Sequence, residues 1–279
     1  MASRGVVPSR SILIWSALIC VLATVASLVG LLESGPYEQE TRNWARQAKG
    51  QDVGNLLAVG ALAISGYYYS KGSFRASLVW VGTLLYFLYA YIVYSLAVHF
   101  NDLFLVYVTI LGLTSYALVF SIDRLRSYDA TFPGSPVRKL AGYTLAAIGG
   151  LFALLWLSEV VPAAIQREVP QSVVDAGLWV NPIHVIDLAV VLPAFVITGY
   201  MTVRGDRSGM FFVGPWLVFS ALMGASIVAA MILMSADGFD NTFPPMMMVS
   251  VVVTASLYAS RRYLQRVEDP VVTRDADAD

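Results

Sequence analysis

The chain has 279 residues, of which 57% are hydrophobic and only 13% charged, with a formal net charge of −1. Soluble domains carry about a quarter charged residues, and here the apolar residues come in long blocks. This composition excludes a soluble enzyme, a disordered chain and a nucleic-acid-binding protein. The single cysteine, Cys20, excludes an internal disulfide and a cysteine-based metal site.

The apolar blocks are long enough to cross a lipid bilayer, which requires roughly 20 residues of helix. In chain order we predict eight spans that contain no Lys or Arg: 11–32, 53–70, 77–98, 103–122, 140–161, 183–203, 210–236 and 244–260. The predicted fold is therefore an all-α polytopic membrane helix bundle that forms a single domain over residues 1–266. Residues 267–279 end in an acidic run and are predicted to be a disordered cytoplasmic tail.

Basic residues are distributed unevenly over the loops between these spans. Fourteen of the 18 Lys and Arg residues fall on the side of the N-terminus, and only Arg42, Arg46, Lys49 and Arg167 fall on the other. Because basic loops remain in the cytoplasm, both termini are predicted to be cytoplasmic. The first apolar run is too long for a usual signal peptide and has no clean cleavage site, so it is interpreted as a span.

The order of loops repeats in the two halves of the chain. Each half has a long external loop, a short basic turn and a short external turn, and residues 75–82 are similar to residues 207–214. This pattern favours two parallel four-helix repeats. Small residues four apart on the fifth span, Gly142, Ala146 and Gly150, predict close contact with a neighbouring helix.

Aromatic residues give further expectations. Trp15, Trp80 and Trp216 lie near predicted cytoplasmic ends of spans, which is typical of an interfacial aromatic belt. The loop over residues 33–52 is predicted to hold a short surface helix with Trp44 among the lipid headgroups. The third span is rich in tyrosines that need partners in a dry environment, so it is predicted to be central.

Asp187 is the most informative polar residue. Asn181 and Pro182 have the character of an N-cap and a first helical residue, so Asp187 lies about one turn inside the sixth span. An ionised carboxylate in lipid costs about 2.5 kcal/mol or more, so Asp187 is expected to face the bundle. Pro193 in the same helix frees a backbone carbonyl at membrane depth.

Other polar residues gather at the predicted external ends of the spans. Together with Asp187 they are predicted to form one polar pocket that opens outward: His99, Asn101, Asp102, Glu159, His184 and Asp187. Its two His-x-x-Asp pairs have the spacing to bind a divalent metal or relay protons. The alternative is a structural role as helix caps and turn residues. The sequence identifies no cofactor, and the metal signal is weak.

Two stretches carry a resemblance: 86–107, which includes HFNDLFLVY, and 181–194, NPIHVIDLAVVLPA. They resemble segments of a group of uncharacterised multi-span membrane proteins of bacteria and archaea. The resemblance implies a prokaryotic cytoplasmic membrane and no particular activity. No pattern of an intramembrane protease, a Walker motif or a Rossmann fingerprint is present.

Three classes of function remain open. The first is a small-solute or ion transporter, or a sensor, with a polar pocket on the external side near Asp187. The second is a membrane-embedded enzyme that uses a metal or acid and base groups at His99, Glu159, His184 and Asp187. The third is a structural or accessory subunit. The expected partners are the lipid bilayer and a small-molecule or ion ligand, without nucleic acid.

Overall fold

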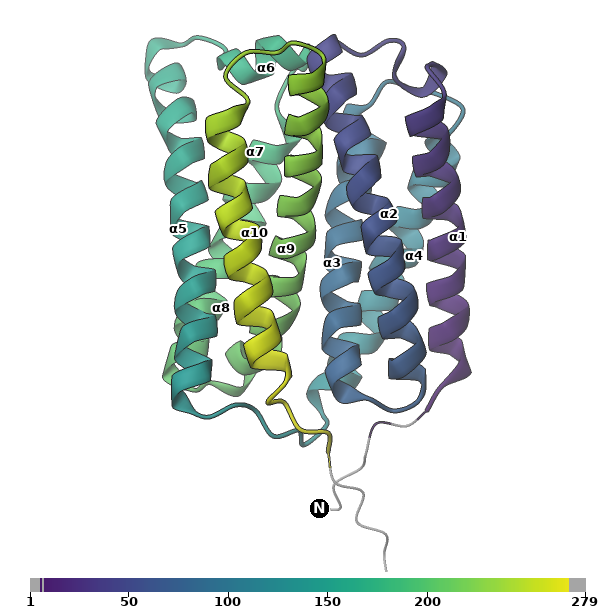
Figure 1. The fold of residues 1–279 in the computed structure, drawn as a ribbon, viewed down its shortest axis with the longest axis vertical. Coiled ribbons are helices and arrows are strands. Elements are labelled where there is room, and N and C mark those ends of the chain that lie inside the picture. The colour runs from purple at the N-terminus through teal and green to yellow at the C-terminus, as the bar shows by residue number, and fades with distance from the viewer. Residues whose placement is uncertain (1–5, 7, 271–279) are drawn as a thin grey trace, which may run out of the picture.

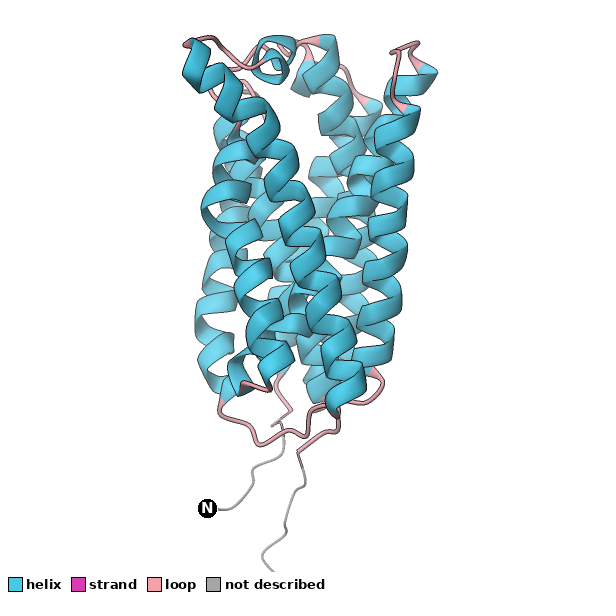
Figure 2. Cartoon of the chain, turned by 90° about the vertical axis from the view of Figure 1, so that its left-hand side faces the viewer, coloured by secondary structure: helices cyan, strands magenta, loops and turns pink. Residues whose placement is uncertain are grey.

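The computed structural model describes residue 6 and residues 8–270. Long helices run side by side along the height of the molecule, and the connections gather at its two ends (Figures 1 and 2). The long helices are α1 (Arg10–Leu32), α2 (Arg42–Ser70), α3 (Phe74–Ala97), α4 (Phe104–Arg126), α5 (Ser135–Gln166), α9 (Arg207–Ala236) and α10 (Phe243–Leu264).

The sixth span consists of three consecutive pieces: α7 (Pro182–Ile186), the π-helical turn η2 (Asp187–Val191) and α8 (Leu192–Arg204). Two short helices, η1 (Gly35–Tyr37) and α6 (Gln171–Ala176), lie in the long connections. Among the described helices, seven spans are long and apolar enough to cross a membrane. The eighth predicted span lies in α2, which is long enough but less apolar. The prediction of an all-α polytopic bundle is confirmed.

The two halves of the chain have the same packing order. In the first half α1 packs on α2, α2 on α3, α3 on α4 and α4 on α1; in the second, α5 packs on α8, α8 on α9, α9 on α10 and α10 on α5. Contacts of α2 and α3 with α9 join the halves (Figure 1). The similar segments 75–82 and 207–214 begin the corresponding helices α3 and α9. This arrangement agrees with the repeated loop lengths.

The predicted central position of the third span is confirmed, because α3 is the most buried of the apolar spans. The helix contacts both its own half and α9 of the other half. Its tyrosines therefore reach partners on both sides.

Helices α5 and α8 approach each other where glycine faces glycine. A Cβ atom on Gly142 would lie 2.7 Å from the carbonyl oxygen of Gly199, and one on Gly199 would lie 2.8 Å from the Cβ of Ala146. Around Gly150, in contrast, no atom of another described helix lies within 4 Å of such a Cβ. The predicted small-residue contact is confirmed for Gly142 and Ala146 and not for Gly150.

Helix α2 begins at Arg42, well before the predicted span. Thr41 caps it by accepting a hydrogen bond from the backbone N–H of Trp44 at 3.2 Å. Trp44 is only 4% exposed, and its indole N–H donates to the carbonyl oxygen of Ala97 at 2.7 Å. The prediction of a surface helix with Trp44 in the headgroups is therefore wrong. The same helix carries Asp52 into the bundle.

The C-terminal segment packs against the bundle beyond residue 266. Val267 is fully buried, the backbone N–H of Glu268 bonds to Thr131, and a carboxylate oxygen of Asp269 accepts the backbone N–H of Phe74 at 2.7 Å. The first residues of the predicted tail thus hold the start of α3. The remainder of that prediction, residues 271–279, lies outside the described residues.

The first described helix begins and the last one ends at the same end of the bundle (Figure 1). The distribution of basic residues predicts that this end is cytoplasmic. In a Cys20→Ser background, a membrane-impermeant thiol reagent added to intact cells is expected to label Asp240→Cys, in the α9–α10 turn, and not Gly134→Cys, before α5. Both positions are exposed. Labelling in the reverse order would show that the orientation is inverted.

Candidate functional site

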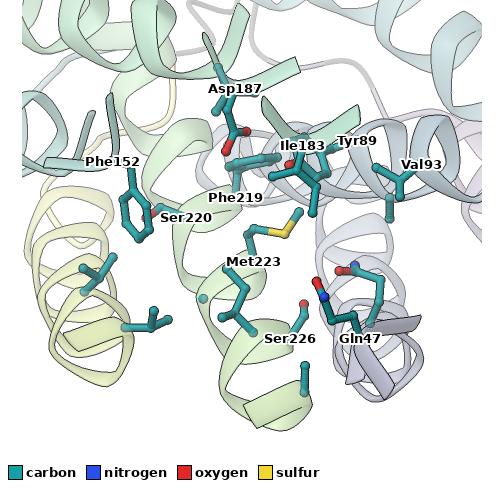
Figure 3. Close-up of a pocket in the computed structure, with 18 of the residues that line it drawn as sticks. Gln47, Tyr89, Val93, Phe152, Ile183, Asp187, Phe219, Ser220, Met223 and Ser226 are labelled. Atoms are coloured by element: carbon teal, nitrogen blue, oxygen red, sulfur yellow. The ribbon is translucent and has the colours of Figure 1, made fainter. Parts of the chain in front are cut away.

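A pocket of about 150 Å³ lies at the junction of the two halves of the bundle. It is partly open and is lined by α2, α3, α5, α9, α10 and the sixth span, and its walls are mostly apolar. Figure 3 shows the carboxylate of Asp187 beside Phe219 and Tyr89, and the amide of Gln47 and the hydroxyl of Ser226 in another part of the pocket. The pocket therefore combines an apolar body with a few polar groups.

The backbone at Asp187 departs from a regular α-helix. Proline has no N–H with which to bond the carbonyl four residues earlier, and Pro193 interrupts the hydrogen-bond ladder in this way. The chain forms a π-helical turn in which the N–H of Leu192 bonds to the carbonyl oxygen of Asp187, five residues back. Such turns are frequent at functional sites. The helix is thus irregular close to Pro193, and the irregularity is a π-turn that begins at Asp187.

Asp187 contacts residues of two neighbouring helices. The indole N–H of Trp156 on α5 donates to its carboxylate at 2.8 Å, and the hydroxyl of Tyr89 on α3 lies near it. A carboxylate has about four acceptor sites, so these contacts leave capacity for a further partner. No Lys or Arg of the described chain forms an ion pair with Asp187. The pocket thus contains an acid without a cationic partner.

His184 lies beside the same tryptophan, and Glu159 lies beside His184. The His184 ring is 4.8 Å from the Trp156 ring, and its Nε2 atom is 3.6 Å from a carboxylate oxygen of Glu159. The other oxygen of Glu159 accepts the backbone N–H of Ser172 at 3.0 Å and so holds the start of α6. Three of the six predicted residues therefore gather around Trp156, although only Asp187 lines the pocket.

The other three predicted residues lie at the α3–α4 turn. The backbone N–H and Nδ1 of His99 contact a carboxylate oxygen of Glu40 at 2.7 and 3.0 Å. The amide of Asn101 donates to the carbonyl of Pro36 at 3.1 Å, and its oxygen accepts the N–H of Leu103 at 2.9 Å. Asp102 is exposed.

These contacts attach the α3–α4 turn to the loop before α2, and the residues act as turn and cap groups. No hydrogen bond or ion pair within the described residues joins them to Glu159, His184 or Asp187. The six residues thus form two groups of three instead of one pocket. Within the described chain, no three His, Cys, Asp or Glu side chains are arranged to hold a metal ion.

Comparisons of the chain with protein-family models, with curated proteins and with solved structures find no match. Function is therefore argued from the geometry of the site.

A second buried acid, Asp52, was not identified from the sequence. It is 2% exposed and accepts hydrogen bonds from the hydroxyl of Tyr37 at 2.7 Å and from that of Tyr94 at 2.8 Å. Gly30 on α1 leaves the space for its carboxylate. One feature of the sequence could have indicated it: after the Thr41 N-cap no residue interrupts the helix, so the second span extends toward its N-terminus and includes Asp52.

A chain of hydrogen bonds connects this region to the pocket. The amide of Gln51 donates to the hydroxyl of Tyr86 at 2.7 Å, and that hydroxyl is 3.0 Å from the hydroxyl of Ser226 on α9. Gln51 and Ser226 both line the pocket. One turn further along the same face of α2, the amide oxygen of Asn55 accepts from the amide of Gln51 at 3.5 Å, and the amide nitrogen of Asn55 donates to Ser27 on α1 at 3.2 Å. Polar contacts therefore link α1, α2, α3 and α9 across the junction of the halves.

Proposed function

We propose that this protein is a membrane carrier or sensor for a small organic cation. The nitrogen of the ligand binds the carboxylate of Asp187, and its apolar body fills the pocket. The observation that carries the proposal is a carboxylate at the wall of an apolar pocket that accepts a hydrogen bond from Trp156, has spare acceptor capacity and has no cationic partner among the described residues. A ligand cation would supply the missing charge.

The size of the pocket suits a ligand group of roughly one ring. An apolar cavity of about 150 Å³ is known to hold benzene, and this pocket has about the same volume. Aromatic side chains from five helices line it, among them Tyr89, Phe152, Trp156 and Phe219. Aromatic faces attract cations, so the walls favour the same charge as Asp187. An anion would be repelled, and a sugar would leave hydroxyl groups unpaired against apolar walls.

The position of the pocket supports a carrier or sensor. In transporters built from repeats, substrate sites lie at the interface between the repeats, and this pocket lies where the two four-helix halves meet. We propose that the protein lies in the cytoplasmic membrane of a prokaryote. Both termini are then on the cytoplasmic side. The resemblance of residues 86–107 and 181–194 and the distribution of basic residues support this location.

Two probes of the same shape test the charge preference: benzylamine, which is protonated at neutral pH, and benzyl alcohol, which is neutral. Calorimetry with the full chain in lipid nanodiscs is expected to give tighter binding of benzylamine. The Asp187→Asn variant is nearly isosteric and is expected to bind benzylamine roughly tenfold to a hundredfold more weakly, which is the size of one charged hydrogen bond. Its affinity for benzyl alcohol is expected to change little.

Asp102→Asn removes an exposed carboxylate at the same end of the bundle and serves as the control. Uptake of labelled benzylamine into vesicles that contain the protein then distinguishes a carrier from a sensor. Equal affinity for the two probes, or equal weakening by Asp187→Asn and Asp102→Asn, would rule out Asp187 as the anchor of a cation.

A further inference from the structure

Asp52 lies directly behind the wall of the pocket. Ala48 and Tyr94 line the pocket, and the hydroxyl oxygen of Tyr94 is 3.0 Å from the carbonyl oxygen of Ala48 and 2.8 Å from Oδ1 of Asp52. A tyrosine hydroxyl has one proton, so it cannot donate fully to both acceptors. The cluster therefore has two hydrogen-bonding states, which differ in the acceptor to which the Tyr94 hydroxyl donates.

Each hydrogen-bonding state corresponds to one protonation state of Asp52. When Asp52 is ionised, the hydroxyls of Tyr37 and Tyr94 both donate to it. When Asp52 is protonated, its own O–H donates to the oxygen of Tyr94, and Tyr94 donates to the carbonyl of Ala48. In both states the donors have acceptors, so neither state leaves an unpaired donor in a dry environment. The cluster is thus suited to gain and lose a proton reversibly.

The surroundings of Asp52 supply hydroxyl groups but no paired cation. The titratable and charged side chains that face it come from η1, α2, α3 and α4: Tyr37, Lys49, Tyr86, Tyr91, Tyr94 and Tyr107. From α1, Ser27 and Gly30 approach it, and neither is charged. Lys49 donates to the carbonyl oxygen of Leu31 at 3.2 Å and forms no ion pair with Asp52.

Tyr37 covers Asp52 from the connection between α1 and α2. It is 4% exposed, and burial, assisted by the nearby charge of Asp52, raises the pKa of Tyr37 well above its ordinary value. Its hydroxyl therefore keeps its proton and remains a donor to Asp52. Unpaired charges in a dry region are costly, and a proton on Asp52 leaves Asp187 as the one charged acid of the two while the pocket is empty.

We infer that Asp52 is a proton-binding site whose occupancy is coupled to ligand binding in the pocket through the hydroxyl of Tyr94. This inference rests on the proposed function. With the pocket empty, Asp52 carries the proton and Asp187 the charge. When a cation binds at Asp187, the O–H bond of Asp52 breaks, the proton passes to bulk water, and the Tyr94 hydroxyl turns from Ala48 to Asp52. One positive charge enters and one leaves, so the net charge of the dry region is unchanged.

The first experiment needs no ligand. Infrared difference spectra of the full chain in nanodiscs, recorded as the pH is raised, are expected to show the loss of the carbonyl band of a protonated carboxylic acid. This band should be absent in Asp52→Asn, present in Asp187→Asn and shifted in Tyr94→Phe. The Asp52→Asn variant is expected to fold, because its amide N–H can donate to Tyr94 as the protonated acid does.

The second experiment measures coupling. Calorimetry of benzylamine binding in two buffers with different ionisation heats reports the protons released. Roughly one proton per ligand is expected from the wild type, nearly none from Asp52→Asn and fewer from Tyr94→Phe, with Asp102→Asn equal to the wild type. Tyr116→Phe, an exposed tyrosine on α4, controls for the loss of a hydroxyl.

Three results would overturn the inference. The first is the absence of an acid band assignable to Asp52 at any pH, and the second is loss of that band on addition of NaCl at constant pH, which would identify a sodium site. The third is proton release that Asp52→Asn leaves unchanged. If benzylamine does not bind at all, the proposed function fails, and the infrared titration still decides whether Asp52 binds a proton.

Discussion

Replacement of Gly142 by leucine is expected to lower the free energy of unfolding by about 3 kcal/mol, near the upper end of the usual cost of overpacking. A Cβ at this position would lie 2.7 Å from the carbonyl oxygen of Gly199 and 2.8 Å from a methyl carbon of Val203. Because the first of these atoms belongs to the backbone, α8 must move as a whole to make room. Unfolding by SDS in mixed micelles, followed by circular dichroism, measures the change.

Gly150→Leu is the matched control. It lies on the same helix, receives the same side chain and gains the same helix propensity, but no atom of another described helix lies within 4 Å of its Cβ position. Its free energy of unfolding is expected to be equal to or greater than that of the wild type. Similar destabilisation in both variants would mean that α5 and α8 do not pack through Gly142 and Gly199.

Replacement of Trp80 by alanine is expected to lower the free energy of unfolding by about 3–5 kcal/mol, the usual cost of removing a fully buried tryptophan. Trp80 is 1% exposed, its indole N–H donates to Ser16 on α1 at 2.9 Å, and its ring packs edge-on against Tyr69 on α2 at 5.3 Å. The variant would leave a cavity between three helices and would remove the donor to the Ser16 oxygen, whose own hydroxyl still donates to the carbonyl of Ile12. The same SDS unfolding assay measures the loss.

Trp179→Ala provides the comparison, because Trp179 is 99% exposed in the connection between α6 and α7. Its removal is expected to change the free energy of unfolding by no more than about 0.5 kcal/mol. A larger loss from Trp179 than from Trp80 would contradict the packing described for α1, α2 and α3. The sequence interpretation of Trp80 as part of an interfacial belt is wrong, because its position along the chain carries no information on the direction of its side chain.

Part of the candidate site could be predicted from the sequence, and part of it could not. The inward position of Asp187 and the disturbance caused by Pro193 follow from local rules, since lipid excludes charge and proline lacks an N–H. The prediction that six polar residues form one pocket was based only on their position at the same end of the bundle. Height along the membrane normal can be counted in residues, whereas the position around the bundle depends on which helices are neighbours.

Asp52 was missed for a related reason. Residues 42–52 are polar, and a criterion based on apolar runs assigns them to a loop. In the structure their polar groups have partners from distant parts of the chain: Arg42 and Arg46 pair with Asp237 at the end of α9, and Asp52 is bonded by Tyr37 and Tyr94. These partners allow a polar segment to continue as part of a spanning helix.

The sequence by itself determined the class of fold, the order of the long helices, the shared side of the two ends and the inward direction of Asp187. It did so because a bilayer imposes one requirement on every residue in turn: apolar side chains outward and every backbone group bonded within its helix. Only the tertiary structure decided that α2 extends to Arg42, that Asp52 lies behind the pocket and that Tyr94 lies between them. Those features depend on side chains from different helices meeting, and such pairings depend on helix packing, which hydropathy along the chain does not encode.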